Sequence, residues 1–250
     1  MKHRGGTSTD QNYRGIPIHA ADSVHEFVTG LLQERLRPGA RIADLGAGHG
    51  ALSLRLRDAG FEVVAFELDR SDWLVSDIRC HQCDFNVSLK PIEAHGPFAA
   101  ICAIEVIDHL ENPINFLRSL ADPRRFNGPL LVMSMPNPLD TFSCIAMFTR
   151  GIFSWAGPAQ YDGGGHISVL PHWLVAEHLK HIGVANQEWQ FLAPYRHPVA
   201  WKSVLYKGVA GMRRLLSRGE GCQPFFDGQT ALVTIDLAQV TSDEHSQKIS

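Results

Sequence analysis

Two periodicities of apolar positions divide the first part of the chain. Between 23 and 36 the apolar residues share one helical face, and Ser23-x-x-Glu26 has the sequence of a capping box. The apolar run at 40–45, "ARIADL", and the β-branched run at 61–67, "FEVVAFE", predict two buried strands. Between them, "ALSLRLRDAG" predicts a helix that ends at Gly60.

The same alternation continues along the rest of the chain. Asn112-Pro113 is a suitable cap and first turn for a helix, and Pro171 and Gly183 bracket another one, "PHWLVAEHLKHIG". Further strands are predicted in "FAAICAIEVI", "GPLLVMSMP", "QEWQFLAP" and "TALVTIDLAQ". Strands that alternate with helices predict a doubly wound α/β fold with a mostly parallel sheet.

The 250 residues fit a single domain with an insertion. We expect a helical cap at 1–36, a core formed by 37–193 and 229–240, an insertion or cap at 194–228, and a loose polar tail at 241–250. The glycine-rich stretch "GPAQYDGGGH", 157–166, is a candidate mobile lid.

Composition narrows the classes of partner. With 23 Lys and Arg against 26 Asp and Glu, the chain lacks the cationic excess of a nucleic-acid-binding protein. The N-terminus has no apolar segment after its basic residues, and no run is long enough for a membrane span, so we expect a cytoplasmic protein. Cys80-x-x-Cys83 is one pair without a second, which favours buried thiols over a zinc site.

Three alternating glycines directly follow the first buried strand, in "IADLGAGHG". Such a turn permits positive φ and lets a ligand lie against bare backbone. The segment from Gly46 to Ala51 satisfies the dinucleotide pattern G-x-G-x-x-G/A, and its three glycines also satisfy the G-x-G-x-G pattern of methyltransferases. Glu67, at the end of the second strand, would bind ribose hydroxyls in either case. The turn alone leaves the cofactor open.

Five segments in order carry a family resemblance: "DLGAGHG", "CDFN", "AIEVIDHLENPINFLRSL", "VMSMPNP" and "GHISVLPHWLVAEHLKHIGV". They resemble class I S-adenosylmethionine (SAM)-dependent methyltransferases, in the branch with the ubiquinone-biosynthesis O-methyltransferases and many enzymes of surface-glycan and natural-product clusters. The resemblance covers about 40–185 and implies a seven-stranded Rossmann-like sheet with helices on both faces and an antiparallel last strand. It also implies that SAM contacts Asp44, Gly46, Ala47, Gly48, Gly50, Glu67, Asp84, Phe85, Ile104 and Tyr13.

The chain departs from the family in two places. Only 16 residues separate Glu67 from Asp84, so the second crossover must be short or irregular. The stretch 194–228 is longer than a hairpin needs. Both departures leave the acceptor substrate undefined.

The candidate chemistry follows from what methyl transfer requires. A hydroxyl acceptor must lose its proton, which calls for a general base or a metal. Glu105, Asp108 and His109 share one face if their segment is helical, and the resemblance associates them with a divalent cation such as Mg²⁺. In the alternative interpretation, Glu105 fixes the turn and His109 packs under the cofactor. His109 is the favoured base because an unperturbed imidazole titrates near neutral pH, with Glu105 and His166 as the other catalytic candidates.

Two further segments could contact the acceptor, a membrane or a second protein chain. The stretch 199–217 predicts a basic amphipathic helix, which fits a substrate cap, a membrane surface or a lipid-linked acceptor. The stretch 140–160 is rich in apolar and aromatic residues, which fits an apolar acceptor or a homo-oligomer contact.

We therefore expect SAM-dependent methyl transfer to a small molecule, most simply at an oxygen of a sugar or natural-product intermediate. The first alternative is an NAD-dependent oxidoreductase, which gives no reason for "CDFN" or "EVIDHLENP". The second is a degenerate methyltransferase fold used for binding or regulation, against which Asp44, Glu67 and Asp84 argue because all three are present.

Overall fold

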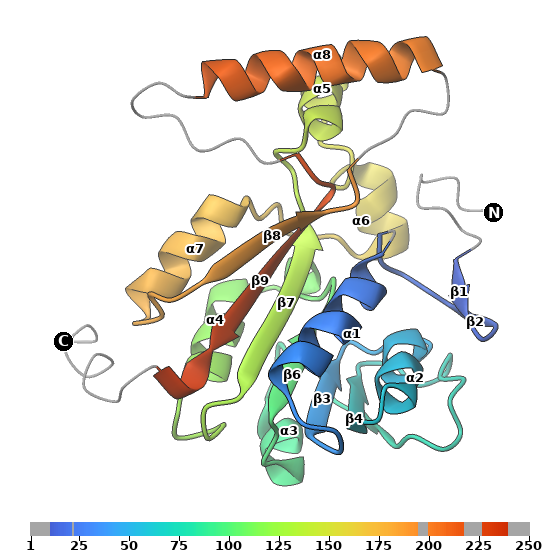
Figure 1. Ribbon diagram of the computed structural model, residues 1–250, viewed down its shortest axis with the longest axis vertical. Coiled ribbons are helices and arrows are strands. Elements are labelled where there is room, and N and C mark those ends of the chain that lie inside the picture. The colour runs from blue at the N-terminus through green and yellow to red at the C-terminus, as the bar shows by residue number, and fades with distance from the viewer. Residues whose placement is uncertain (1–10, 22, 195–199, 218–226, 240–250) are drawn as a thin grey trace.

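The computed structural model describes residues 11–21, 23–194, 200–217 and 227–239 (Figure 1). The predicted tail at 241–250 and parts of the predicted cap and insertion lie outside the described residues. In the described part of the chain, no helix combines the length and the apolar character needed to cross a bilayer.

A seven-stranded sheet forms the centre of the molecule. Its strand order is β5-β4-β3-β6-β7-β9-β8; β9 runs antiparallel to both of its neighbours, and the other pairs are parallel. The predicted Rossmann-like sheet with an antiparallel last strand is thus confirmed. The strands are β3 (Arg41–Leu45), β4 (Glu62–Glu67), β5 (Cys80–Gln82), β6 (Ala100–Ala103), β7 (Leu130–Pro136), β8 (Glu188–Leu192) and β9 (Thr230–Asp236).

Helices cover both faces of this sheet. On one face, α1 (Val24–Arg35) and α2 (Ala51–Asp58) bury their apolar stripes in one core cluster. On the other face, α4 (Pro113–Ala121) and α7 (His172–His181) do the same in a larger cluster. The short helix α3 (Lys90–His95) adds Ile92 to the larger cluster. The central parallel strands β3, β6 and β7 are buried from both sides, which explains their nearly continuous apolar sequences.

The ends of the helices test the predicted caps individually. The side chain of Asn112 accepts a hydrogen bond from the backbone of Asn115, and Gly60 takes φ 95° just after α2, so both predictions are confirmed. The prediction of a capping box at Ser23 was wrong, because Ser23 adopts a left-handed conformation and its side chain makes no capping hydrogen bond. Glu26 instead forms an ion pair with Arg55 of α2.

Several elements differ from or add to the prediction. A small hairpin, β1 (Asn12–Tyr13) and β2 (Ile16–Pro17), precedes α1. The prediction of a loop at 157–166 was wrong: Pro158–Gly164 forms the helix α6, because a proline starts its first turn and Gly165 ends it in a left-handed conformation. Its role as a mobile lid stays a prediction. The segment 68–79 contains no helix, as its short length predicted. The remaining helices are α5 (Thr141–Arg150), α8 (Ala200–Leu216) and two 3₁₀ turns, η1 (Ile107–His109) and η2 (Leu237–Gln239).

Candidate functional site

The glycine turn joins β3 to α2 at the carboxyl edge of the sheet. Gly46 has φ 68°, and a Cβ there would come within 2.5 Å of the Val106 side chain. Gly50 has φ 98°, and a Cβ there would meet Val75 at 2.5 Å. Gly48 also has positive φ, 53°, but a Cβ there would meet nothing within 4 Å. The outer glycines are therefore required by packing, whereas Gly48 borders open space that a ligand can use.

Two carboxylates flank this turn. Asp44 is buried in β3, and its Oδ2 accepts a hydrogen bond of 2.6 Å from the Ser53 hydroxyl. Burial raises the pKa of Asp44 to about 7. Glu67, the last residue of β4, accepts hydrogen bonds of 2.7 Å from the backbone N–H groups of Gly48 and Leu68. Glu67 therefore reaches the glycine turn directly from the neighbouring strand.

A narrow cleft lies between the glycine turn and the segment before α1. Its lining includes five of the residues predicted to contact a cofactor: Asp44, Gly46, Ala47, Gly48 and Ile104. Its volume is about 50 Å³, far below the roughly 300 Å³ of a small ligand pocket. A cofactor can enter only if side chains at the rim move.

Three histidines that also line this cleft were missed by sequence reasoning or given no role in it. His19 and His49 stack with their ring centroids 4.7 Å apart and nearly parallel planes. His25 is buried; its Nδ1 has no hydrogen-bond partner in the described part of the chain, and burial lowers its pKa to about 4. The position of His25, beside Val24 on the buried face of α1, was the available sequence signal.

The other predicted cofactor residues lie outside the cleft lining. Asp84 follows β5, and its Oδ1 accepts a hydrogen bond from the backbone N–H of Asn86. Phe85 packs near Phe116, with ring centroids 5.8 Å apart. The hydroxyl of Tyr13 donates a hydrogen bond to Asp58 of α2 at 2.9 Å, and its role at the cofactor stays a prediction. The hairpin that carries Tyr13 could not be recognised from its two-residue strands.

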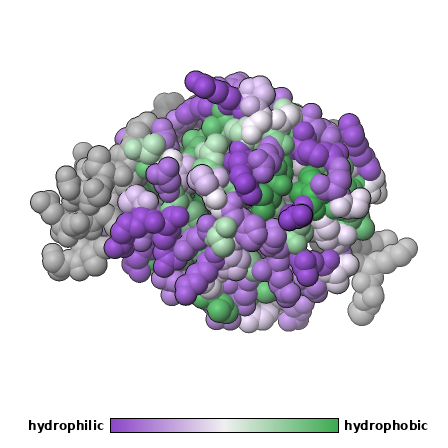
Figure 2. Space-filling view, turned by 90° about the horizontal axis from the view of Figure 1, so that it is seen from below, coloured by the Kyte–Doolittle hydropathy of each residue, from purple (hydrophilic) through white to green (hydrophobic). Residues whose placement is uncertain are grey.

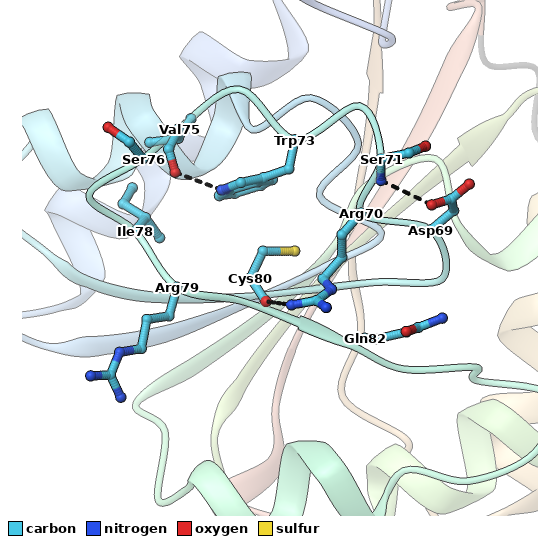
Figure 3. Close-up of a pocket in the computed structure, with 10 residues that line it drawn as sticks. All are labelled: Asp69, Arg70, Ser71, Trp73, Val75, Ser76, Ile78, Arg79, Cys80 and Gln82. Carbon is cyan, nitrogen blue, oxygen red and sulfur yellow. Dashed lines mark hydrogen bonds between the residues drawn. The ribbon is translucent and has the colours of Figure 1, made fainter.

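A second and larger cavity, of about 620 Å³, lies beside the segment that joins β4 to β5 (Figure 3). Its shape is maintained by local contacts: the Trp73 indole donates to the Val75 carbonyl, and the Arg70 guanidinium donates to the Cys80 carbonyl. This is where a second crossover helix would otherwise cover the sheet. None of the predicted catalytic or cofactor residues lines it.

The turn after β6 positions the acidic residues. Glu105 has φ 55°, a strained conformation for a residue other than glycine. Its backbone N–H donates to the Ser134 hydroxyl oxygen, and that hydroxyl donates to its Oε1 at 2.7 Å. Burial, followed by the nearby Asp108 charge, raises the pKa of Glu105. The next residues form a 3₁₀ turn at 107–109 rather than an α-helix, so the helical segment that would place Glu105, Asp108 and His109 on one face is absent.

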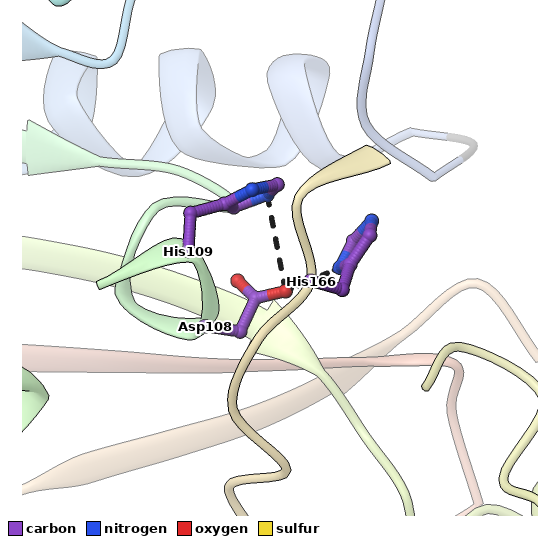
Figure 4. Close-up of side chains that lie close together, drawn as sticks. All are labelled: Asp108, His109 and His166. Atoms are coloured by element: carbon purple, nitrogen blue, oxygen red, sulfur yellow. Dashed lines mark hydrogen bonds and ion pairs between the residues drawn. The ribbon is translucent and has the colours of Figure 1, made fainter. Parts of the chain in front are cut away.

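Asp108 is paired instead with a histidine far along the chain (Figure 4). The Nδ1 of His166 lies 2.5 Å from the Asp108 Oδ2, and the Nε2 of His109 lies 3.9 Å from the same oxygen. The Asp108 carbonyl accepts hydrogen bonds from the backbone N–H groups of Ile167 and Ser168, which fixes the segment after α6 against η1. Asp108 is 2% exposed, so this carboxylate is withdrawn from water and directed at the two imidazoles.

The electrostatics of the two histidines are opposite. The hydrogen bond that His166 donates to Asp108 is the largest cause that raises the pKa of His166. Burial is the largest cause that lowers the pKa of His109. The ring centroids are 4.6 Å apart. His109 is thus kept neutral, while His166 has the carboxylate partner that fixes an imidazole tautomer.

The same side chains can supply metal ligands. Asp108, His109 and His166 each offer one ligand atom, and these atoms lie within 4.8 Å of one another. The Oδ1 of Asp108 is buried without a hydrogen-bond partner in the described residues. This group contains two of the three predicted ligands, Asp108 and His109, together with His166, and Glu105 is not part of it.

Comparisons with known proteins agree with this geometry. The strand order, with a glycine turn after β3 and an acid at the end of β4, defines the class I methyltransferase fold. The chain belongs to a methyltransferase-domain family, whose sequence model matches residues 18–201. In structure it is similar to a SAM dependent methyltransferase from Archaeoglobus fulgidus, with a TM-score of 0.57 and 15% identity over 85% of this chain and 94% of that one.

Curated relatives are similar over a shorter range. A ubiquinone biosynthesis O-methyltransferase from Caulobacter sp. (strain K31) is 24% identical over 131 residues, 50% of this chain and 52% of that protein. One from Xanthomonas axonopodis pv. citri (strain 306) is 32% identical over 130 residues, 48% of this chain and 52% of that protein. The chain thus spans about half the length of the curated relatives it matches.

Proposed function

We propose that this protein transfers a methyl group from SAM to an oxygen of a small molecule, a sugar or natural-product intermediate. The observation that carries the proposal is the glycine turn, where Gly48 leaves open space between the carboxylates of Asp44 and Glu67. A ligand with a cationic amino-acid end and a ribose fits these groups. SAM, when bound, supplies the activated methyl group.

The residues around the turn suggest how this ligand is held. Asp44 and the backbone of the turn face the amino-acid end, and Glu67 turns from Gly48 towards the ribose hydroxyls. Asp84 and Phe85, at the end of the neighbouring strand β5, serve the nucleoside. Glu67 leaves the Gly48 amide when it binds the ribose. Because the cleft has a volume of only about 50 Å³, binding also requires His19 and His49, which line it, to separate.

The Asp108–His166 pair supports deprotonation of a hydroxyl acceptor. The carboxylate accepts a hydrogen bond from the Nδ1–H of His166 and leaves Nε2 as the basic nitrogen, as in other acid-oriented imidazole bases. As the acceptor oxygen forms its bond to the methyl carbon and the carbon–sulfur bond breaks, the hydroxyl proton passes to this Nε2. Asp108 is a positioning residue in this scheme, and His166 takes the role that the sequence favoured for His109.

A cation held by Asp108, His109 and His166 is the second candidate for the same step. It is favoured by the unpartnered Oδ1 of Asp108. A cation there would supply Lewis acidity to the acceptor oxygen. Two imidazoles and one carboxylate suit Zn²⁺, Fe²⁺ or Mn²⁺ better than the Mg²⁺ suggested by the sequence resemblance.

The proposal is tested first at the cofactor. Thermal unfolding is followed with SAM, S-adenosylhomocysteine or NAD, and a ligand at a hundredfold excess over its dissociation constant adds about 2.7 kcal/mol of stability. Stabilisation by the two sulfur nucleotides but not by NAD supports it, whereas folded protein that responds to neither sulfur nucleotide refutes it. Methyl transfer is then assayed over hydroxylated acceptors with and without a chelator, which separates the base from the metal.

A further inference from the structure

The helix α8 is attached to the rest of the molecule by its polar side. The Tyr206 hydroxyl accepts a hydrogen bond from the backbone N–H of Phe142 at 3.0 Å and donates one to Asp227 at 3.3 Å. About two helical turns after Tyr206, the Arg213 guanidinium donates a hydrogen bond to the Leu139 carbonyl at 3.0 Å. Tyr206 is buried. Polar groups thus fix the orientation of this helix on the start of α5.

The opposite side of α8 is apolar and faces solvent. An ordinary surface helix buries its apolar stripe and exposes its polar one, so α8 is reversed. Figure 1 shows α8 lying across one end of the molecule, above α5. On the neighbouring helix α5, Phe148 is 91% exposed. The exposed apolar stripe of α8 consists of Val204 (71%), Leu205 (62%), Met212 (56%), Leu215 (64%) and Leu216 (67%).

The opposite end of the molecule has a different surface. Seen from below, hydrophilic residues cover most of it, and hydrophobic residues appear only in small groups between them (Figure 2). The end opposite α8 therefore does not share the apolar exposure of that helix. The stripe on α8 needs a specific partner, because a continuous apolar face on one helix is costly to leave in water.

The charges of α8 indicate what that partner is. The helix contains no Asp or Glu between 200 and 216, although the chain as a whole has a net charge of -3. Lys207 and Arg214 are exposed and, seven residues apart, lie on one flank of the stripe. A second copy docked on the same face would bring these cations against their own counterparts. An anionic surface with an apolar interior matches both features.

We propose that α8 is an interfacial anchor that lies in the headgroup region of an anionic lipid bilayer. The stripe enters the acyl boundary, while Lys207 and Arg214 contact the lipid phosphates. Its 17 residues lie in the plane of the membrane and do not span it. This inference is independent of the proposed methyl transfer, because binding to lipid and binding to SAM have separate readouts.

The test is co-sedimentation of the full chain with phosphatidylcholine vesicles that contain or lack phosphatidylglycerol. We expect binding to the anionic vesicles only. Raising the salt from about 0.1 M to about 1 M, which shortens the Debye length from about 10 to about 3 Å, should weaken it. The double variant Leu215→Ser/Leu216→Ser should need about tenfold more lipid for half-binding, or more, because it removes much of the inserted apolar area.

Matched controls keep the result interpretable. Leu68→Ser/Leu74→Ser makes the same change at leucines that are 55% and 56% exposed outside α8, and it should bind lipid like the wild type. Thermal unfolding, with and without SAM, confirms that each variant is folded. Equal binding by the two double variants overturns the proposal. So does a dimer in light scattering that Leu215→Ser/Leu216→Ser converts to monomer, since a second copy would then be the occupant.

Discussion

The Oε2 of Glu67 accepts a hydrogen bond of 2.7 Å from the backbone N–H of Gly48, across the gap between two neighbouring strands. This contact ties the carboxylate to the one glycine of the turn that borders open space. In the proposed function, the ribose of SAM binds to the same carboxylate. Cofactor binding in the proposed function is therefore an exchange of hydrogen bonds. Glu67 loses the one from the Gly48 amide and accepts others from the ribose hydroxyls.

Glu67→Gln should weaken SAM binding without unfolding the protein. The amide oxygen still accepts from Gly48, but the charge-assisted hydrogen bonds are lost, and these contribute about 1.5–3 kcal/mol each. We expect the dissociation constant, measured by calorimetry, to rise about tenfold to a hundredfold. Glu62→Gln, at the exposed start of the same strand, is the control and should bind SAM normally. Normal binding by Glu67→Gln would remove this carboxylate from the cofactor site.

Gly48→Ala separates the folding role of the turn from its binding role. The φ of 53° makes alanine cost about 1–2 kcal/mol, but its Cβ would contact nothing in the described structure. The variant should fold with a modestly lower unfolding free energy and lose most SAM affinity, because the methyl group occupies the space that a ligand needs. Calorimetry on both ligand binding and unfolding measures the two effects.

Gly39→Ala is the matched control for this change. Gly39 also has positive φ, 77°, and open space around its would-be Cβ, but it lies outside the candidate site. It should lose similar stability and keep its affinity for SAM. Equal loss of affinity in both variants would mean that backbone strain, and not the space beside Gly48, controls binding.

The sequence was most informative where structure is determined locally. The glycine turn, its flanking strand and helix, and the Asn112 cap depend on contacts within a few residues, so the predicted boundaries agree with the structure. The prediction of a loop at 157–166 failed because a local signal was given too little weight. The abundance of glycine suggested a loop, but Pro158 and Gly165 stand where a short helix needs its first turn and its end.

The candidate site depended on contacts that the sequence does not display. Asp108 and His166 were both named as candidates, but their pairing joins positions 58 residues apart and requires the segment after α6 to lie on η1. Periodicity placed Glu105 with Asp108, whereas the positive φ of Glu105 turns it towards Ser134. The roles of the site residues, the single-domain layout and the cytoplasmic location remain predictions.

Asp44→Asn should stabilise the free protein at neutral pH. Burial raises the pKa of Asp44 from 3.8 to about 7, so the wild type loses stability from this group as pH rises from about 4 to about 7. At 1.36 kcal/mol per pH unit, the variant should gain up to about 4 kcal/mol relative to the wild type at pH 8 and almost nothing at pH 4. Denaturant unfolding at the two pH values measures this difference.

The control for Asp44→Asn is Asp58→Asn, whose expected change in stability has the opposite sign. Asp58 has a lowered pKa because Arg57 and Tyr13 donate hydrogen bonds to it against a desolvation that raises the pKa, so Asp58→Asn should destabilise the protein at neutral pH. Asp44→Asn should also reduce the stabilisation by SAM, since its charge is removed from the cleft. A variant with unchanged stability and unchanged response to SAM would contradict both roles of Asp44.

Asp108→Asn tests whether His166 acts as the base. The hydrogen bond that His166 donates to Asp108 raises the pKa of His166 above 6.5, and only neutral His166 accepts a proton, so wild-type kcat should rise with pH through a value above 6.5. Without the carboxylate, burial is the dominant effect on His166 and lowers its pKa, so the rise of kcat with pH should move to lower pH. The maximal kcat should fall about 10²–10⁴-fold, because the tautomer and orientation of the imidazole are no longer fixed.

Stability should change in the same variant with a defined sign. The raised pKa of His166 contributes stability that is fully present below pH 6.5 and is lost as pH rises through the folded-state pKa. Asp108→Asn should therefore destabilise the protein more at pH 6 than at pH 9. His178→Asn, at a histidine of α7 outside the candidate site, should leave both profiles unchanged. A kcat limb that stays in place in Asp108→Asn, together with activity abolished by a chelator, would assign the step to a cation and not to His166.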